Sequence, residues 1–222
     1  MSKKVLAATL AAMGMLTGMQ HAAGEDNLFK KYAYDTPISK YTEAAGYYDC
    51  STDIGATARC LDDVDFLDQK FTAALVFSGD KLMLVSLFAP YDRDLYGRAI
   101  GALAKTFTLV SLADGKSVLD LVELAGKAKN KDEYTAKLTN YENVALTAND
   151  LTYSFVEGLT PAKAKGATNV LGLMNSAPAN IRGADLIISG EGDESSIIIK
   201  FSFPKLDENK LVQQVNKPVE SF

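Results

Sequence analysis

The two cysteines of the chain, Cys50 and Cys60, could support redox chemistry, metal binding or a structural bridge. Their C-x9-C spacing differs from the C-x-x-C spacing that tunes a thiol for exchange. Two thiols alone cannot form a four-cysteine metal site. In an exported protein two cysteines are expected to pair. We therefore predict a structural disulfide that holds the loop Ser51 to Arg59 against a strand over 61–66, with a stabilisation of roughly 3 kcal/mol on the chain-entropy model.

An acidic cluster follows the second cysteine and could bind calcium, which prefers oxygen ligands. Its members are Asp62, Asp63, Asp65 and Asp68. The stretch DDVDFLD has no glycine at a bend and no glutamate at the twelfth position of an EF-hand loop, so Asp63 and Asp65 are only weak metal candidates. On a strand these two would share one face, Asp62 would point the other way, and Val64 and Phe66 would face the core. We predict a charged, solvated strand edge, and no metal or other cofactor.

Five of the ten tyrosines precede the first cysteine: Tyr32, Tyr34, Tyr41, Tyr47 and Tyr48. Tyrosine offers a large rigid contact area and a hydroxyl, which favours it at recognition surfaces. The alternative is that the rings pack the N-terminal segment across a sheet with their hydroxyls at the rim, and we weigh this ahead of recognition. If a binding surface exists, we expect it to combine these rings with Asp53 and Arg59.

Several catalytic chemistries are excluded by the absence of histidine from the chain after His21. A Ser-His-Asp or Cys-His nucleophile, a histidine base and the usual imidazole zinc site all need that side chain. Ser78 and Lys81 match S-x-x-K, but they lie in a predicted turn and lack the companion motifs of penicillin-recognising enzymes. Paired carboxylates remain chemically possible, with candidates Glu43, Asp49, Asp53 and Glu157.

The first 24 residues have the features of a secretory signal peptide. Lys3 and Lys4 precede an uncharged apolar stretch, and small residues follow at 22–24. No later apolar run approaches the roughly 20 residues needed to cross a bilayer. We therefore predict removal of residues 1–24, a soluble mature chain, and a periplasmic or secreted location.

The charge balance of the chain is acidic, with 23 Lys+Arg against 28 Asp+Glu, and cleavage would remove two of the lysines. No basic run is present that would attract phosphate backbones or anionic lipid heads. We therefore expect no nucleic-acid partner and no membrane insertion of the mature protein.

The strongest element prediction is a β-hairpin over 70–88, because two period-2 runs flank Ser78-Gly79-Asp80. Both of its faces are apolar, so we place it centrally in a sheet covered on both sides. A second hairpin is predicted over 184–203 and ends at Pro204. Between them, Asp92 caps an amphipathic helix over 93–105, and a strand begins at Phe107.

The remaining elements carry weaker patterns. Ser117 and Asp120 have the form of a capping box, which predicts a helix from 118 to about 128, and Asp132 begins another to about 140. A strand or bent hairpin follows over 143–158. Thr160-Pro161 begins a helix in which Ala167, Val170, Leu171 and Met174 share a stripe. A short helix over 38–45 precedes the cysteines.

Together these elements indicate an α+β fold: an antiparallel β-sheet built from hairpins, with amphipathic helices packed on it. The order hairpin, helices, hairpin is compatible with two loosely similar halves. We expect one domain over 25–204 and a C-terminal tail over 205–222 that is partly disordered.

The leading functional hypothesis is an exported, non-catalytic module that binds a protein or small ligand of the cell envelope. One alternative is a hydrolase or lyase that uses carboxylates and tyrosine. Another is a self-assembling envelope protein that oligomerises through its sheet edges. A cavity with two carboxylates roughly 5–10 Å apart would favour the enzyme. An exposed apolar patch rimmed by tyrosine would favour the binding module.

Overall fold

A computed structural model describes residues 26–147, 150–159, 166–190 and 192–208. The predicted signal peptide and the start of the predicted helix at Thr160-Pro161 lie outside these residues. None of the helices in the described part of the chain has the length and apolar character that a membrane crossing requires.

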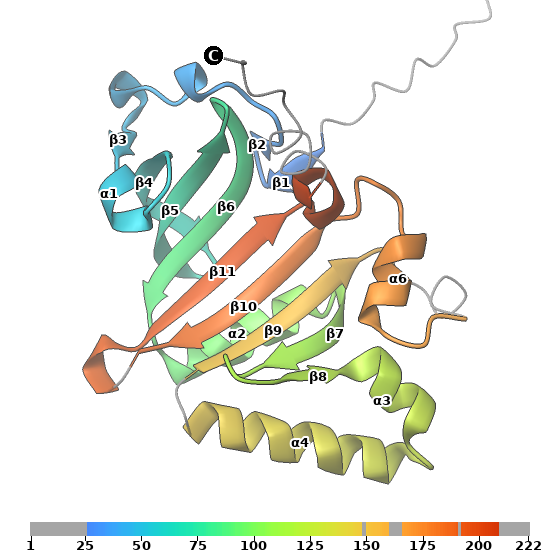
Figure 1. The fold of residues 1–222 in the computed structure, drawn as a ribbon. Coiled ribbons are helices and arrows are strands. Elements are labelled where there is room, and N and C mark those ends of the chain that lie inside the picture. Colours follow the sequence, from blue (N-terminus) through green and yellow to red (C-terminus); the bar gives the residue numbers. More distant parts are fainter. Residues whose placement is uncertain (1–25, 148–149, 160–165, 191, 209–222) are drawn as a thin grey trace, which may run out of the picture.

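The body of the protein is a nine-stranded sheet in which every neighbouring pair is antiparallel (Figure 1). The strand order is β3-β4-β5-β6-β11-β10-β9-β7-β8. The strands are β3 (Tyr48–Asp49), β4 (Ala58–Phe66), β5 (Gln69–Ser78), β6 (Lys81–Pro90), β7 (Phe107–Ala113), β8 (Val118–Asp120), β9 (Asp150–Glu157), β10 (Gly183–Ser189) and β11 (Ser196–Ser202). The predicted α+β class is therefore confirmed.

The hairpin predicted over 70–88 is formed by β5 and β6. Ser78 pairs with Lys81, so Gly79 and Asp80 are the two turn residues, and both have the positive φ that a type I′ turn requires. The predicted second hairpin is also present, because β10 pairs with β11 along its whole length. These two hairpins lie side by side, since β6 pairs with β11.

Strand β4 joins β5 through a turn at Leu67 and Asp68, which also have positive φ. A bulge interrupts this pair: Leu61 pairs with Ala73 and Val64 with Phe71, which leaves Asp62 and Asp63 opposite one residue. The prediction that Asp62 and Asp63 point to opposite faces of a regular strand is therefore wrong at this bulge. The bulge changes the phase of the strand, and Val64 still packs against the core as expected.

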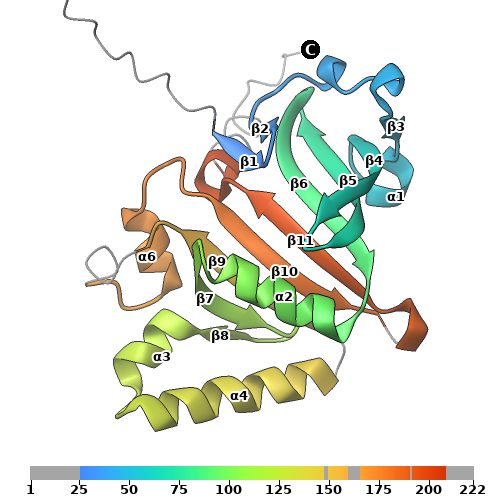
Figure 2. The same ribbon diagram turned by 180° about the vertical axis from the view of Figure 1, so that it is seen from behind.

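One face of the sheet carries the main core and is covered by helices and by the N-terminal segment (Figure 2). Helix α2 (Arg93–Leu103) lies across this face, and Asp92 caps it by accepting from the Leu95 amide at 2.7 Å. Leu95, Ala99 and Leu103 are buried against the strands, as the helical stripe predicts.

The N-terminal segment contributes a two-stranded sheet and two single 3-10 turns to the same covered face. Its elements are β1 (Asn27–Phe29), β2 (Tyr32–Ala33), η1 (Ile38–Lys40) and η2 (Glu43–Ala45). The helix predicted over 38–45 is thus divided in two, because Tyr41 leaves the helical region and η2 begins after an extended Thr42.

The segment between β7 and β9 differs most from prediction. Residues Val118–Asp120 form strand β8 instead of a helix start, and Asp120 is the N-cap of α3 (Leu121–Lys127). Helix α4 (Lys131–Thr147) runs further than expected, so only β9 remains of the strand region predicted over 143–158.

Near the C-terminus, α6 (Val170–Ser176) is capped by Asn169, which accepts from the Gly172 amide at 2.8 Å. Leu173 is its buried residue, whereas Leu171 is exposed and does not join the predicted stripe. Strand β11 ends before Pro204 as expected, but residues 204–208 are helical. The predicted tail is therefore ordered at its start, where Leu206 packs against the core.

Candidate binding surface

The predicted disulfide is present between Cys50 and Cys60, whose Cα atoms are 5.8 Å apart. Both cysteines are buried, and they pack with Ala58 and Ala74 on the sheet face opposite α2. The short helix α1 (Ser51–Ile54) lies within the closed loop. The bridge therefore attaches this loop to β4, as predicted, and covers one end of the second sheet face.

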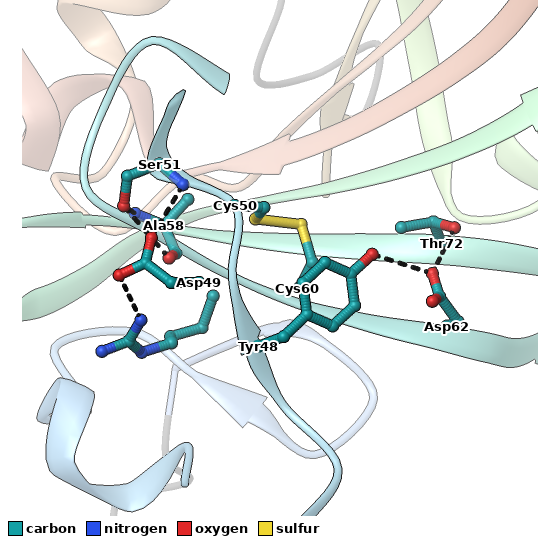
Figure 3. Close-up of a disulfide and its surroundings, with 9 residues drawn as sticks. Tyr48, Asp49, Cys50, Ser51, Ala58, Cys60, Asp62 and Thr72 are labelled. Carbon is teal, nitrogen blue, oxygen red and sulfur yellow. Dashed lines mark hydrogen bonds and ion pairs between the residues drawn. A yellow bond between two sulfur atoms is a disulfide. The ribbon is translucent and has the colours of Figure 1, made fainter. Parts of the chain in front are cut away.

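Polar side chains surround the disulfide and hold β3 to its neighbours (Figure 3). The Tyr48 hydroxyl donates to an Asp62 carboxylate oxygen at 3.1 Å, and the Thr72 hydroxyl donates to the same oxygen at 2.7 Å. Partial burial raises the pKa of Tyr48, and the hydrogen bond to Asp62 raises it further. Asp62 is therefore engaged with two hydroxyl donors in this structure.

Asp49 and Arg59 form an ion pair on the outer side of the loop, with a nitrogen to oxygen distance of 2.6 Å. Asp49 also accepts from the Ser51 amide at 2.9 Å. Hydrogen bonds from Ser51, reinforced by Arg59, lower the pKa of Asp49 to about 2. Asp53 is exposed on α1. Of the predicted binding residues, Asp53 is close enough to Tyr48 for its charge to contribute to the raised pKa, whereas Arg59 aligns with Leu75 and projects to the other side of the sheet.

The tyrosine-rich segment does not present a recognition surface, because most of its rings are in the core. Tyr32, Tyr41 and Tyr47 are 2%, 8% and 5% exposed, and their rings contact one another and Phe77. The packing interpretation therefore holds for these three.

Two tyrosines of the segment remain outside this buried group. Tyr34 is half-buried, and its hydroxyl donates to Asp207 at 2.9 Å. Tyr48 is 41% exposed. Tyr48 is therefore the member of the predicted tyrosine surface that a partner could reach most readily.

The second sheet face is crossed by a row of aligned residues, one from each strand. The pairing register aligns, in strand order, Tyr48, Cys60, Ala74, Ser86, Lys200, Asp185, Ser154, Ser111 and Asp120. Paired residues project to the same side of a sheet. The centre of this face is therefore polar and carries both charge signs.

Apolar side chains flank the polar row on the central strands. Leu84 and Phe88 of β6, Ile198 of β11 and Ile187 of β10 are each only half-buried. In Figure 1 no helix passes in front of β6, β11 and β10, while α1 and α6 lie toward the two ends of the sheet. We call this area, defined by the four apolar residues with Ser86, Asp185 and Lys200, the open face. Ser86 itself is buried, so this side of β6 is covered in part: the prediction that both faces of the β5–β6 hairpin are covered is wrong at Leu84 and Phe88.

Asp185 is the acidic residue at the centre of the open face. Burial raises its pKa, against a hydrogen bond from Ser154 and the charge of Lys200, which both lower it. Desolvation is the largest of these effects, so the carboxylate is held in an environment that disfavours its charge. A partner that brought a cation to this position would stabilise the charged form.

No group of three or more His, Cys, Asp or Glu side chains in the described part of the chain could hold a metal. Asp63 and Asp65, the weak metal candidates, are exposed at the outer side of β4. Lys70 pairs with Asp65 at 2.6 Å. Strand β3 pairs only with Arg59 and Cys60, so the aspartates lie along a stretch of β4 that has β5 on one side and no described strand on the other.

Two large cavities do not contain, among their described lining residues, the carboxylate pair that a hydrolase would use. A cavity of 660 Å³ is lined by Glu157, whose carboxylate is paired with Arg182 at 2.7 Å. A second, of 590 Å³, has no carboxylate among its lining residues. A smaller hollow of 280 Å³ is lined by the adjacent Asp62 and Asp63, but Asp62 is bonded to its two hydroxyl donors.

A cluster that the sequence did not reveal lies on the covered face. The hydroxyl of Tyr153 donates to Glu142 and hydrogen-bonds with the Tyr96 hydroxyl, which lies 3.2 Å from the same Glu142 oxygen. Burial is the main cause that raises the pKa of Tyr96 to about 12 and that of Tyr153 above its usual range. None of these three residues lines the cavities described above, so the cluster joins α2 and α4 to β9.

Comparison with known proteins gives no relative: no family model matches the chain, and no curated protein or solved structure matches it either. The fold and the open face are therefore the basis for assigning a function.

Proposed function

We propose that the protein is an exported, non-catalytic binding module of the cell envelope, and that the open face binds its protein partner. The observation that supports this is the centre of the sheet, which no helix in the described part of the chain covers and where Leu84, Phe88, Ile187 and Ile198 are only half-buried beside Lys200 and Asp185. Interfaces combine apolar contact area with a few polar groups that fix orientation. The central strands offer both on one rigid surface.

The proposed export rests on the signal-like first 24 residues and on the disulfide. Disulfides persist in oxidising compartments such as the periplasm and the extracellular space. The bridge and the leader therefore support the same location, periplasmic or secreted.

Self-assembly through sheet edges is less well supported than binding through a face. The sheet ends in β3 and β8, which are two and three residues long. Next to β3, the uncovered part of β4 carries a bulge and three exposed aspartates. Short strands, bulges and charges are the features by which proteins avoid edge-to-edge pairing.

The proposal can be tested by capture of partners from envelope extract with the purified mature protein. Ile198→Lys and Phe88→Lys place a charge on the open face, and we expect both to lose the captured partner. Val144→Lys is the matched control, because Val144 is 60% exposed on α4, which packs on the covered face. Melting temperatures should confirm that all three variants fold.

Tyr48→Ala extends the test to the disulfide end of the sheet, where it removes an exposed ring. Tyr47 is unsuitable for this purpose, because its ring is buried. Equal capture by the unmodified protein and by both open-face variants would show that the open face is not the binding surface.

A further inference from the structure

A second candidate site lies at the β7 edge of the sheet, away from the open face. Helices α3 and α6 contact each other and, with β7, enclose a cleft of 590 Å³. Small-molecule sites have volumes of roughly 300–1,000 Å³. We define the α3–α6 cleft by its lining residues Val110, Val122, Gly126, Tyr134, Leu159 and Leu173.

The lining of the α3–α6 cleft is uncharged and mostly apolar. None of the described residues around it is acidic or basic, and Thr108 and Tyr134 supply the polar side chains. The neighbouring 660 Å³ cavity shares Leu159 and Leu173 with it but contains the Glu157–Arg182 ion pair. A charged ligand would lose its hydration in the α3–α6 cleft without gaining a counter-charge from the described lining residues, which therefore favour a neutral ligand.

The hydroxyl of Tyr134 is a donor at this uncharged wall. No hydrogen bond joins it to another residue in the described part of the chain. A tyrosine phenol keeps its proton at neutral pH and can donate, and burial raises the pKa of Tyr134 further. None of the buried side-chain oxygens in the described residues lacks a partner, so the Tyr134 hydroxyl is not buried and a ligand can reach it.

The backbone of β7 adds polar groups along the same cleft. Strand β8 pairs only with residues Ser111 to Ala113 of β7, so no described strand lies beside Thr108 to Val110 on that side. The opposite wall leaves room, because a methyl group placed on Gly126 would meet no atom within 4 Å. The cleft therefore combines open space, an apolar floor and a small number of hydrogen-bonding groups.

We propose that the α3–α6 cleft binds a neutral, mostly apolar small molecule that carries a hydrogen-bond acceptor, which the Tyr134 hydroxyl contacts. The apolar part of the ligand lies on Val110 and Leu173. This site goes beyond the proposed protein-binding function, and it lies at the β7 end of the sheet, whereas the open face lies on β6, β11 and β10.

The test uses Prodan, a neutral fluorescent naphthalene ketone, titrated into the purified protein. We expect saturable binding with a blue-shifted emission, because the probe enters an apolar site. Gly126→Leu fills the cleft and should weaken binding roughly tenfold or more, since the side chain takes the volume that the ligand needs. Gly101→Leu in α2 is the matched control, because Gly101 is also helical with no atom within 4 Å of an added methyl group.

Two further measurements test the chemistry of the site. Tyr134→Phe should weaken Prodan binding roughly two- to tenfold, because one hydrogen bond is lost while the ring is retained. Anilinonaphthalene sulfonate, an anionic naphthalene dye, should bind more weakly than Prodan. The proposal is overturned if Prodan does not bind saturably, if Gly126→Leu and Gly101→Leu behave alike, if Tyr134→Phe binds as well as the unmodified protein, or if the anionic dye binds as tightly.

Discussion

Asp185 is the residue of the open face whose charge the fold disfavours most clearly. Its pKa is raised by burial despite Ser154 and Lys200. Because the folded pKa lies above the unfolded value of about 3.9, the folded state retains a proton that the unfolded state has already lost. The contribution of protonated Asp185 to the free energy of unfolding is fully present below the unfolded pKa. It is lost as the pH rises through the folded pKa, where the buried carboxyl becomes charged.

Asp185→Asn should therefore raise the free energy of unfolding at neutral pH, because it removes the cost of a poorly solvated charge. The gain should shrink as the pH falls and should vanish below about pH 4. Urea denaturation across this range measures it. Asp53→Asn is the control, since Asp53 is exposed on α1. A gain for Asp185→Asn that is constant with pH would contradict the assigned cause.

Single residues were predictable from the sequence where chemistry leaves few options. Cys50 and Cys60 had only each other as partners, and the disulfide is confirmed. Tyrosine leaves more options, because one side chain suits both a core and a surface. Tyr47 is buried and its neighbour Tyr48 is exposed. The sequence pattern around them does not separate the two outcomes, because their positions depend on the η2 and β3 geometry.

Among the elements, α3 and α6 depend on one carboxylate. Asp120 accepts from the Glu123 amide at 2.9 Å, which caps α3, and from the Val170 amide at 2.7 Å, at the first residue of α6. Asp120→Ala should therefore leave amides at two helix starts without their partner. We expect it to lower the free energy of unfolding by about 2–3 kcal/mol, measured by urea denaturation.

Asp92→Ala provides the comparison, because Asp92 caps only α2 through the Leu95 amide. The expected loss for one cap is about 1 kcal/mol. If Asp120→Ala cost no more than Asp92→Ala, the contact between Asp120 and α6 would add nothing to stability.

The elements that were predicted correctly have an apolar periodicity that identifies the helix or strand and a capping or turn residue that marks where it begins or ends. The β5–β6 hairpin has period-2 runs and Gly79, and α2 has Asp92 and an apolar stripe. The β4–β5 turn lacks such a signal, because Leu67 and Asp68 adopt positive φ without glycine or asparagine. At β8, the Ser117–Asp120 spacing imitates a capping box, but the residue that caps is Asp120 itself, so the helix starts three residues later.

For the whole molecule, the sequence indicates that both faces of the central strands are apolar. It does not indicate which of the two faces the helices cover. Leu84 and Phe88 on one side of β6, and Val85 and Leu87 on the other, are equally apolar in pattern. The difference arises from long-range packing: α2 and the N-terminal segment cover the Val85 side, and α1 and α6 reach only the ends of the other. The open face could therefore be found only in the folded molecule.

Closure of the covered face depends on Arg182, which connects the N-terminal segment to the sheet. Its guanidinium donates to the Glu157 carboxylate at 2.7 and 2.9 Å and to the carbonyls of Asn27 and Leu28 at 3.0 and 3.2 Å. It also lies over the Phe107 ring, 5.1 Å from the centroid. One side chain therefore joins β1, β9 and the residues before β10.

Arg182→Met should destabilise the fold by about 2–3 kcal/mol, because Glu157 and two carbonyl oxygens lose their donors. The loss should be local: amides of β1 and β2 should exchange hydrogen faster than those of β10, since this small hairpin depends on the contact. Lys70→Met is the control, as the Lys70–Asp65 pair is exposed and should cost less than about 1 kcal/mol. Uniform acceleration of exchange across the sheet would mean instead that the N-terminal segment and the sheet unfold as one unit.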